Sequence, residues 1–229
     1  MLKAAVLPPT LILFTREPLA GLTKTRLIPR IGAANAAALA HAFTLDALVR
    51  ASVIGLPIVV AASGPEGSRS HYFRGLARRF STSLIDQGVG TLGARMRRSL
   101  EPYSANGALL IGTDTPSMPP RFIERGIILL RQAPVVLGPS LDGGYYLVAT
   151  RGEPPDIFRG IRWGGSRVLT ETITRLRCSE TRFALTPTWY DIDRWDDLLL
   201  LAAHLRILRR AGTDPCPTTA KLLRQLGLL

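Results

Sequence analysis

The stretch 109–119, LLIGTDTPSMP, decides the fold class of this sequence. Its first residues form an apolar run without polar alternation, which is typical of a strand buried on both faces of a parallel sheet. The run leads directly to Asp114, and the prolines that follow it prevent further regular structure. The stretch therefore predicts a buried strand that ends at a carboxylate.

Short apolar runs of this kind alternate with longer segments of helical spacing along the chain. Strands are predicted over 10–14, 57–62, 83–86, 108–112, 135–138 and 145–149, and 182–190 is predicted to be extended. Helices are predicted over 33–51, 71–80, 91–100, 121–132, 166–178, 196–210 and 218–226. The alternation indicates a three-layer α/β/α sandwich around a mainly parallel, mixed sheet. No linker or repeat divides the chain, so we expect a single domain over residues 1–229.

The composition is that of a chain able to form a sizeable core. Its 229 residues are 46% hydrophobic, and a chain of this length buries about 70% of its unfolded surface. Cys178 and Cys216 form no C-x-x-C pair, so a reducing, cytoplasmic location is expected. Pro8 and Pro9 interrupt the apolar N-terminal run, which favours a first strand over a signal peptide. No uninterrupted apolar stretch reaches the ~18 residues of a membrane span.

The charge is strongly positive, with 29 Lys and Arg against 17 Asp and Glu and a net charge of +12. Such a surplus favours anionic partners, such as nucleotides or phosphorylated metabolites. Arginines spread over solvated faces explain it equally well. The basic residues are scattered and no nucleic-acid module is present, which disfavours a nucleic-acid partner.

The segment 16–30, REPLAGLTKTRLIPR, follows the first predicted strand and carries Gly21, Lys24 and Arg26. Glycine allows close approach to the backbone, and Lys and Arg are suited to phosphate oxygens. The spacing is not that of a Walker A loop, which would need a second glycine before Lys24. A nucleotide-binding loop and an ordinary basic surface loop therefore stay open as alternatives.

Asp114 lies where a parallel strand delivers its carboxyl end, and ligands of such sheets bind there. A carboxylate at this place is costly to desolvate unless a cation or hydrogen-bond donors satisfy it. Mg²⁺ or Mn²⁺ is commonly held by one or two carboxylates together with substrate phosphates. We favour a metal-site role for Asp114 over the alternative of a simple turn residue.

Two later segments add candidate residues. In GPSLDGGYYL, 138–147, Asp142 precedes Gly143, Gly144 and Tyr145, which could contact a sugar or acceptor as well as form a D-G turn.

In YDIDRWDDL, 190–198, Asp191 and Asp193 would share one face of an extended segment, and Asp193 is the favoured second metal ligand. Asp196 and Asp197 are expected to cap a helix. Trp163 is read as core, with lining of an acceptor pocket as the minority alternative.

These segments together resemble the GT-A superfamily of nucleotide-diphospho-sugar transferases. The set EPLAGLTKTRL, QG…LGARM, LLIGTDTPSMP, GPSLDGGYYL and DIDRWDDL is most similar to a bacterial glycosyltransferase-like family named for association with radical-SAM and selenium domains. The K-T-R-L-x-P loop is also similar to 2-phospho-L-lactate guanylyltransferase. The resemblance implies Lys24 and Arg26 at donor phosphates, Asp114 and Asp193 at Mg²⁺ or Mn²⁺, and Asp142 at the sugar or acceptor.

The leading hypothesis is a metal-dependent glycosyltransferase that uses a nucleotide-sugar, with Asp114 and Asp142 as catalytic residues. The alternative is a nucleotidyltransferase acting on a nucleoside triphosphate. A non-catalytic binder of anions or nucleic acid is the third hypothesis. The acceptor is not identified by the sequence, and the Leu-rich helix 196–210 could pack internally or form a homodimer.

Overall fold

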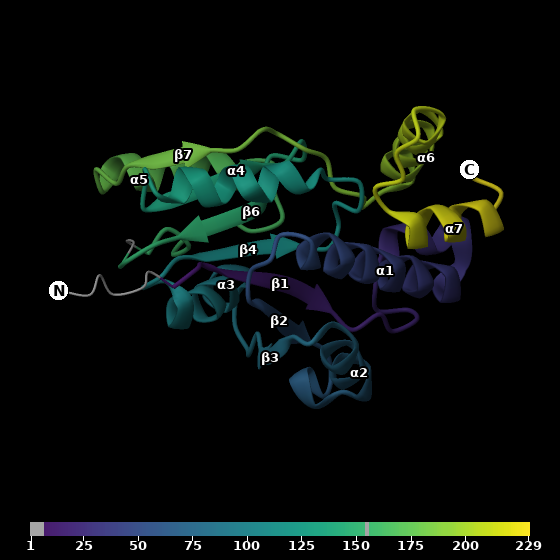
Figure 1. Ribbon diagram of the computed structural model, residues 1–229, viewed down its shortest axis with the longest axis horizontal. Coiled ribbons are helices and arrows are strands. Elements are labelled where there is room, and N and C mark those ends of the chain that lie inside the picture. The colour runs from purple at the N-terminus through teal and green to yellow at the C-terminus, as the bar shows by residue number, and fades with distance from the viewer. Residues whose placement is uncertain (1–6, 154–155) are drawn as a thin grey trace.

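The computed structural model describes residues 7–153 and 156–229 and is built around a seven-stranded sheet (Figure 1). Across the sheet the strands run in the order β3-β2-β1-β4-β6-β5-β7. Their bounds are β1 Thr10–Arg16, β2 Ile58–Ser63, β3 Ser83–Asp86, β4 Ala108–Gly112, β5 Val135–Pro139, β6 Tyr145–Thr150 and β7 Phe183–Leu185. Strand β6 is antiparallel to both β4 and β5, whereas the other pairings are parallel. The predicted mainly parallel, mixed sheet is thereby confirmed.

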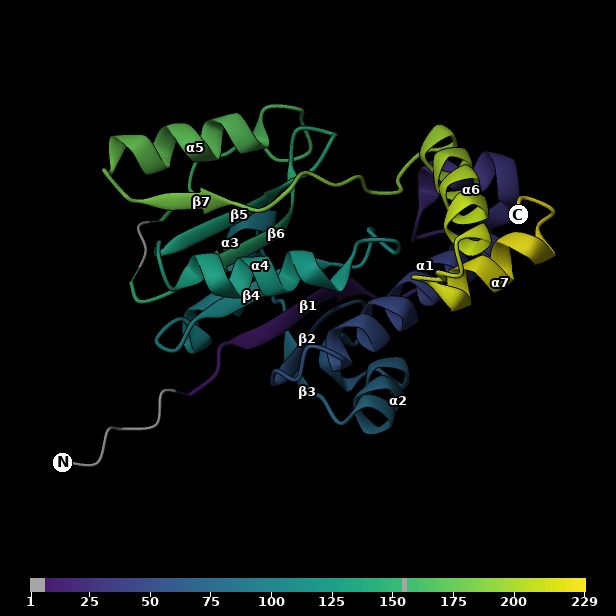
Figure 2. The ribbon, with the colours of Figure 1, turned by 45° about the horizontal axis from the view of Figure 1, so that its top comes forward.

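Helices cover both faces of the sheet, as the sequence pattern predicts (Figures 1 and 2). On one face α1 Ile28–Ser52, α2 His71–Phe80 and α4 Pro120–Leu130 pack on side chains such as Leu11 and Leu13 of β1. On the other face α3 Leu92–Leu100 and α5 Val168–Cys178 pack on Ile12 and Leu110. Alternate residues of β1 therefore face two separate cores, which explains why the strand is apolar throughout.

The last two helices form a third apolar cluster against the first part of α1. Helices α6 Trp195–Arg210 and α7 Pro217–Gln225 bury Leu201 and Leu223 next to Leu39 and Phe43 of α1. In Figure 1 they lie beyond the ends toward which the arrows of β1 and β4 point. This cluster holds the segment before α6 at the carboxyl edge of the sheet, where the candidate site is formed.

Helix α1 is the longest and most apolar helix of the fold. Together with the short 3-10 helix η1 (Thr25–Leu27) it makes one stretch, Thr25–Ser52, that is long and apolar enough to cross a membrane, although 61% of its window is buried within the protein. Packing on the sheet and on α7 accounts for this apolar character. Gly32 interrupts the helical backbone with a φ of 79°, a left-handed conformation that suits glycine.

Most predicted elements agree closely with the observed ones, and the differences have local causes. Helix α1 begins at Ile28, with Pro29 in its first turn, but its uninterrupted part follows the break at Gly32, in agreement with the predicted start at 33. The predicted extended segment 182–190 yields only β7 and an isolated bridge between Ser140 and Trp189. The apolar N-terminal run begins within residues 1–6, which lie outside the described part of the chain. Strand β1 itself starts at Thr10, as predicted.

Asp46 links α1 to the start of α7. It is 1% exposed, and its two carboxylate oxygens accept hydrogen bonds from the backbone N–H groups of Thr218 and Thr219, at 3.0 and 2.8 Å. We predict that Asp46→Ala lowers the free energy of unfolding by about 1–3 kcal/mol, because a helix cap and buried hydrogen bonds are lost.

Urea denaturation measures this change. The matched control is Asp214→Ala, which removes only a partly exposed ion pair with Arg209 and is expected to cost less than about 0.5 kcal/mol. Equal effects of the two substitutions would contradict the capping role of Asp46.

Candidate functional site

Three segments that are distant in the sequence meet at the carboxyl edge of the sheet. They are the loop after β1, the residues after β4, and the irregular segment 190–194 before α6. The backbone N–H of Ile192 donates to the carbonyl of Asp114 at 2.9 Å, which ties the third segment to the end of β4. This is the edge at which ligands bind in open α/β sheets.

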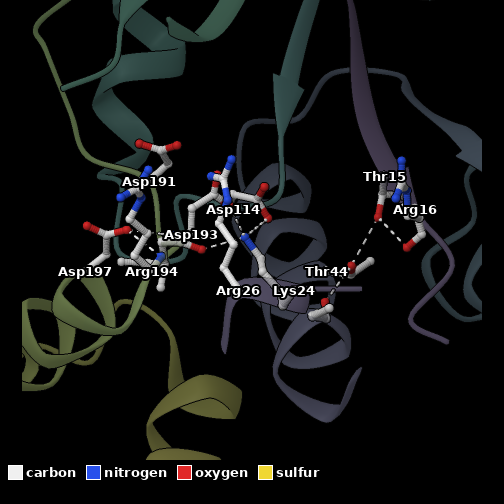
Figure 3. Close-up of polar contacts among 12 residues, drawn as sticks. Thr15, Arg16, Lys24, Arg26, Thr44, Asp114, Asp191, Asp193, Arg194 and Asp197 are labelled. Carbon is white, nitrogen blue, oxygen red and sulfur yellow. Dashed lines mark hydrogen bonds and ion pairs between the residues drawn. The ribbon is translucent and has the colours of Figure 1, made fainter. Parts of the chain in front are cut away.

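The ammonium group of Lys24 lies at the centre of this junction (Figure 3). Its Nζ is 2.8 Å from Asp114 Oδ1 and 3.0 Å from Asp193 Oδ1, and it donates to the Ile192 carbonyl at 2.5 Å. An ammonium group has three N–H donors, so these contacts can use all of them. Lys24, Asp114 and Asp193, each predicted as a site residue, are thus brought together by the fold.

Electrostatics holds this cluster together. Burial by itself would lower the pKa of Lys24, but attraction to Asp114 and Asp193 outweighs it, so the pKa is raised. Burial would raise the pKa of Asp193, but Lys24 and then Arg26 and Arg194 hold it below its usual range. The side chain of Asp114 is 47% exposed, so its desolvation is smaller than the sequence suggests.

The backbone around the cluster is arranged to keep Lys24 in place. Lys24 adopts a left-handed conformation with a φ of 50°, which is unfavourable for a residue with a side chain. Arg26 Nη1 lies 3.3 Å from Asp193 Oδ2. Asp197 accepts from the N–H groups of Asp193 and Arg194 at 3.0 and 2.7 Å, which confirms the predicted capping role of Asp197. Strain at Lys24 is tolerated because its contacts determine its position.

A cleft of about 450 Å³ opens beside the cluster. Three cations, Arg16, Lys24 and Arg95, line it together with the carboxylates of Asp114, Asp191 and Asp193. Gln87 positions Arg95, because its side-chain amide donates to the carbonyls of Thr15 and Ala61 while its oxygen accepts from Arg95 Nη2. We call this part of the cleft the basic half.

The Arg95 guanidinium also lies 5.5 Å from the centre of the Phe14 ring. Burial, with Arg16 and Arg98 nearby, lowers the pKa of Arg95. Arg16 and Arg95 form no salt bridge within the described residues, so both guanidinium groups are available to an anionic ligand.

A second pocket of about 220 Å³ adjoins the first and shares Asp114, Tyr145 and Asp191 with it. Its charged lining residues are Asp114, Asp142 and Asp191, and its aromatic lining residues are Tyr145, Tyr146 and Trp163. We call this pocket the acidic half.

Tyr145 and Trp163 meet edge to face, with ring centres 6.3 Å apart. Burial raises the pKa of the Tyr145 phenol, and its oxygen is buried, so this side chain offers its ring to the pocket.

The two carboxylates of the acidic half have different surroundings. Asp142 is exposed, and its Oδ1 accepts from the Gly144 N–H at 2.8 Å, so the predicted turn is formed. Asp191 Oδ1 accepts from the Ser140 hydroxyl at 2.7 Å. Burial raises the pKa of Asp191; the Ser140 hydrogen bond opposes this effect, and repulsion from Asp142 and Asp193 adds to it.

The predicted glycines divide into different roles. Gly144 lines the acidic half, whereas Gly143, with a φ of 89°, packs where a Cβ would collide with the backbone carbonyl of Ser166. Gly21, with a φ of 83°, is exposed and is not among the residues that line the cleft. Its predicted nucleotide contact gains no support from its position.

Four residues of the cleft were not singled out by the sequence or were weighed as secondary: Arg16, Arg95, Asp191 and Trp163. Arg95 lies within the LGARM piece of the resemblance, which was the only signal for it. Trp163 packs against the second apolar core, as predicted, and it also lines the acidic half. Gly93 makes room for its ring, since a Cβ there would collide with it. Asp191 and Asp193 both line the cleft but contact different partners.

The cluster also has the chemistry of a divalent-cation site. Oδ1 of Asp114 and Oδ1 of Asp193 lie 2.8 and 3.0 Å from the same nitrogen, so at most 5.8 Å separates them. Both already face one positive charge, that of Lys24. The described residues contain no group of three or more His, Cys, Asp or Glu able to hold a metal. Two carboxylates completed by donor phosphates would still suit Mg²⁺.

Comparison with known proteins gives the family. A family model described as "Uncharacterized protein conserved in bacteria (DUF2064)" matches residues 44–165. The chain belongs to this family. The matched region includes Arg95, Asp114, Asp142 and Trp163, whereas Lys24 and Asp193 lie outside it. Among the curated proteins none matches the sequence.

Solved structures share the fold. A candidate nucleotide-diphospho-sugar transferase from Desulfovibrio desulfuricans G20 matches with a TM-score of 0.83 and 25% identity over 94% of each chain. CMP:2-keto-3-deoxy-manno-octonic acid synthetase complexed with CTP matches 87% of this chain and 99% of its own, with a TM-score of 0.53 and 12% identity. 4-diphosphocytidyl-2C-methyl-D-erythritol synthase from Anaerococcus prevotii DSM 20548 matches 88% of this chain and 97% of its own, with a TM-score of 0.56 and 13% identity. The fold is that of the nucleotide-diphospho-sugar transferases.

The close packing of Gly143 gives a test of how the acidic half is built. We predict that Gly143→Ala lowers the free energy of unfolding by more than about 1 kcal/mol, because the new Cβ meets the Ser166 backbone and the positive φ is strained.

The matched control is Gly144→Ala, whose φ is not in the positive range and whose Cβ would meet only the Asp142 side chain, at 3.1 Å. It is expected to change the free energy of unfolding by less than about 0.5 kcal/mol. Equal urea midpoints for the two variants would contradict this account of the turn.

Proposed function

We propose that this protein is a transferase that binds a nucleotide-activated donor in the basic half of its cleft and passes a glycosyl group to an acceptor in the acidic half. The observation that carries the proposal is the Lys24 cluster at the carboxyl edge of a nucleotide-diphospho-sugar transferase fold. It lies where the two halves meet, since Asp114 lines both.

The basic half suits the diphosphate of such a donor. Arg16, Lys24 and Arg95 line one cleft, and guanidinium and ammonium groups form strong charge-assisted hydrogen bonds with phosphate oxygens. Phe14, Thr15 and Thr44 of the same cleft offer a mixed apolar and polar surface for the nucleoside. The CTP complex of one structural neighbour is consistent with nucleotide binding in this fold.

Asp114 and Asp193 are proposed to hold Mg²⁺ or Mn²⁺ together with the donor phosphates. When bound, the ion would neutralise charge on the leaving nucleotide. Because the Lys24 ammonium lies between the two carboxylates, it competes with the ion in the absence of donor. Donor phosphates offer Lys24 alternative acceptors, so metal and nucleotide are expected to bind together.

In the transfer itself, an acceptor hydroxyl oxygen bonds to the anomeric carbon while the bond from that carbon to the donor diphosphate breaks. The electron pair leaves with the nucleoside diphosphate, and the hydroxyl proton passes to a carboxylate. Asp142 was predicted for this role. Asp191 is better placed, since it lines both halves, whereas Asp142 is exposed and engaged in its turn. Asp142 then orients the acceptor.

Nucleotidyl transfer is the second candidate. Arg16 and Arg95 form no salt bridge within the described residues, and together with Lys24 they suit a triphosphate as well as a diphosphate. Two structural neighbours are synthetases of nucleotide-linked products, although at 12% and 13% identity they bear on the fold alone. The finer resemblance, to radical-SAM-associated transferases and to 2-phospho-L-lactate guanylyltransferase, stays a prediction.

A ligand panel tests the donor class. With Mn²⁺ present, we predict that nucleotide-sugars and nucleoside diphosphates raise the melting temperature of the wild-type protein. Lys24→Met should weaken their binding by about 10- to 100-fold, because a charge-assisted contact is lost.

Arg30→Met, in the first turn of α1, is the control. Arg30 stacks near Trp195 and does not line the cleft, so affinity should be unchanged. Stabilisation by triphosphates alone would remove the glycosyl proposal in favour of nucleotidyl transfer. Stabilisation by no nucleotide would refute both.

The metal assignment makes a separate prediction. Mn²⁺ should raise the affinity of the wild-type protein for the nucleotide that the panel selects. Asp114→Asn and Asp193→Asn should each abolish most of this gain and the metal-dependent turnover, because a carboxylate ligand is lost. Calorimetric titration with and without Mn²⁺ measures the gain. Asp196→Asn, an exposed position at the start of α6, should keep it; an equal loss there would sink the assignment.

A further inference from the structure

The acidic half of the cleft has a charge opposite to that of the chain as a whole. The protein carries a net charge of +12, yet no Lys, Arg or His is among the residues that line this pocket, all of which lie in the described part of the chain. Its charged residues are Asp114, Asp142 and Asp191. Whatever binds there meets carboxylates.

Only one of these carboxylates is neutralised. Asp114 is paired with Lys24 at 2.8 Å, whereas Asp142 and Asp191 form no salt bridge within residues 7–153 and 156–229. Arg162, which precedes Trp163, pairs with Glu171 and does not line the pocket. Two of the three carboxylates of the pocket therefore have no cationic partner within the described residues.

A buried hydroxyl in the same pocket needs a partner. Thr115 lines the pocket and is 2% exposed, and its Oγ1 has no hydrogen-bond partner in the described structure. A buried hydroxyl without a partner is costly, and such groups in native proteins call for an explanation. A hydroxyl or amino group of a bound molecule would satisfy it.

The walls of the pocket are apolar and aromatic. Trp163 and Tyr145, which line the pocket, meet edge to face. Phe158 does not line the pocket but packs against Trp163, with ring centres 6.3 Å apart. Met96 and Val168 add aliphatic surface. Surfaces of this type bind the apolar face of a ring, while polar groups at the edge fix its orientation.

We infer that the acceptor of this transferase is a neutral or amino-bearing polyhydroxyl compound with a ring face, and that phosphorylated and carboxylated acceptors are rejected. The inference rests on the proposed function, since it assigns the acidic half to the acceptor. It deepens that function by naming the class of substrate. Three features contribute to the selection: ring packing on Trp163, a hydrogen bond to Thr115 Oγ1, and the carboxylates of Asp142 and Asp191, which have no salt bridge within the described residues.

Three probes that share one scaffold test the charge selection: 4-nitrophenyl β-glucoside, its 2-amino-2-deoxy analogue and 4-nitrophenyl β-glucuronide. Each is titrated calorimetrically into the protein alone and into the protein with saturating Mn²⁺ and the nucleoside diphosphate selected above. We expect the glucoside and the amino analogue to bind at least about tenfold more tightly than the glucuronide, because like charges oppose the carboxylate.

Two charge-reversal variants locate the selection. Asp142→Lys should remove the tenfold preference or reverse it. Glu124→Lys, a charge-matched change on the exposed surface of α4, should leave it intact. Binding of the glucuronide as tight as that of the glucoside in the wild-type protein would overturn the inference. Binding of none of the three probes would overturn it as well.

Thr115→Val separates recognition from stability. Because Thr115 Oγ1 has no partner in the described structure, its removal should leave the urea midpoint unchanged or raise it. The affinity for the glucoside should nevertheless fall about two- to tenfold, as expected for one lost hydrogen bond. Unchanged affinity would refute the contact with Thr115.

The acceptor class and the transferase function can be refuted separately. Nucleotide binding that depends on Lys24, without the expected order of the probes, would overturn the acceptor class and leave the transferase proposal intact. The expected order of probes without any nucleotide binding would refute the transferase function while leaving a pocket selective for neutral and amino-bearing ligands.

Discussion

The buried ammonium of Lys24 joins the loop after β1 to the end of β4 and to the segment before α6, through Asp114, Asp193 and the Ile192 carbonyl. A charge that is 6% exposed is stable only when it is paired and its donors are used, so the three segments must meet in one arrangement. The ammonium also occupies a position between two carboxylates that suits a divalent ion. The structure of the site and its proposed chemistry thus depend on the same contact.

The cleft around this contact is divided by charge. Arg16, Lys24 and Arg95 line one side and Asp142 lines the other, whereas Asp114 and Asp191 line both. In a transferase this division separates a diphosphate-bearing donor from an acceptor of a different charge class. Each substrate is then favoured in its own half of the cleft and disfavoured in the other. The strong positive charge of the chain therefore says less about its substrates than the placement of a few side chains does.

The position of the site on the sheet follows from the topology. Strands β1 and β4 are parallel neighbours, so the loops that follow them leave the sheet at one edge. The α6–α7 cluster packs on α1 and brings the segment 190–194 to that edge from the end of the chain. A fold of this type can therefore build one site from residues near 24, 114 and 193, with the sheet as a rigid support.

Several features of the site could be predicted from sequence because their causes are local. An apolar run ending at Asp114 predicts a buried strand with a carboxylate at its end, and Asp197 is a capping residue by its place in the first turn of α6. Gly21 could not be excluded by such reasoning, since a glycine in a basic loop has the same local pattern whether it lines a cleft or not. Arg95 required Gln87 and β1 to place it.

By itself the sequence determined the alternation of strands and helices, the mixed sheet and the candidate residues at the strand ends, because hydrophobic period and turn chemistry act over a few residues. Only the tertiary structure decided that Lys24 neutralises Asp114 and Asp193, that Asp191 faces Ser140, and that Trp163 and Thr115 share a pocket with Asp142. These relations join residues far apart in the chain. Their distances depend on how helices and strands pack in three dimensions, which no local pattern encodes.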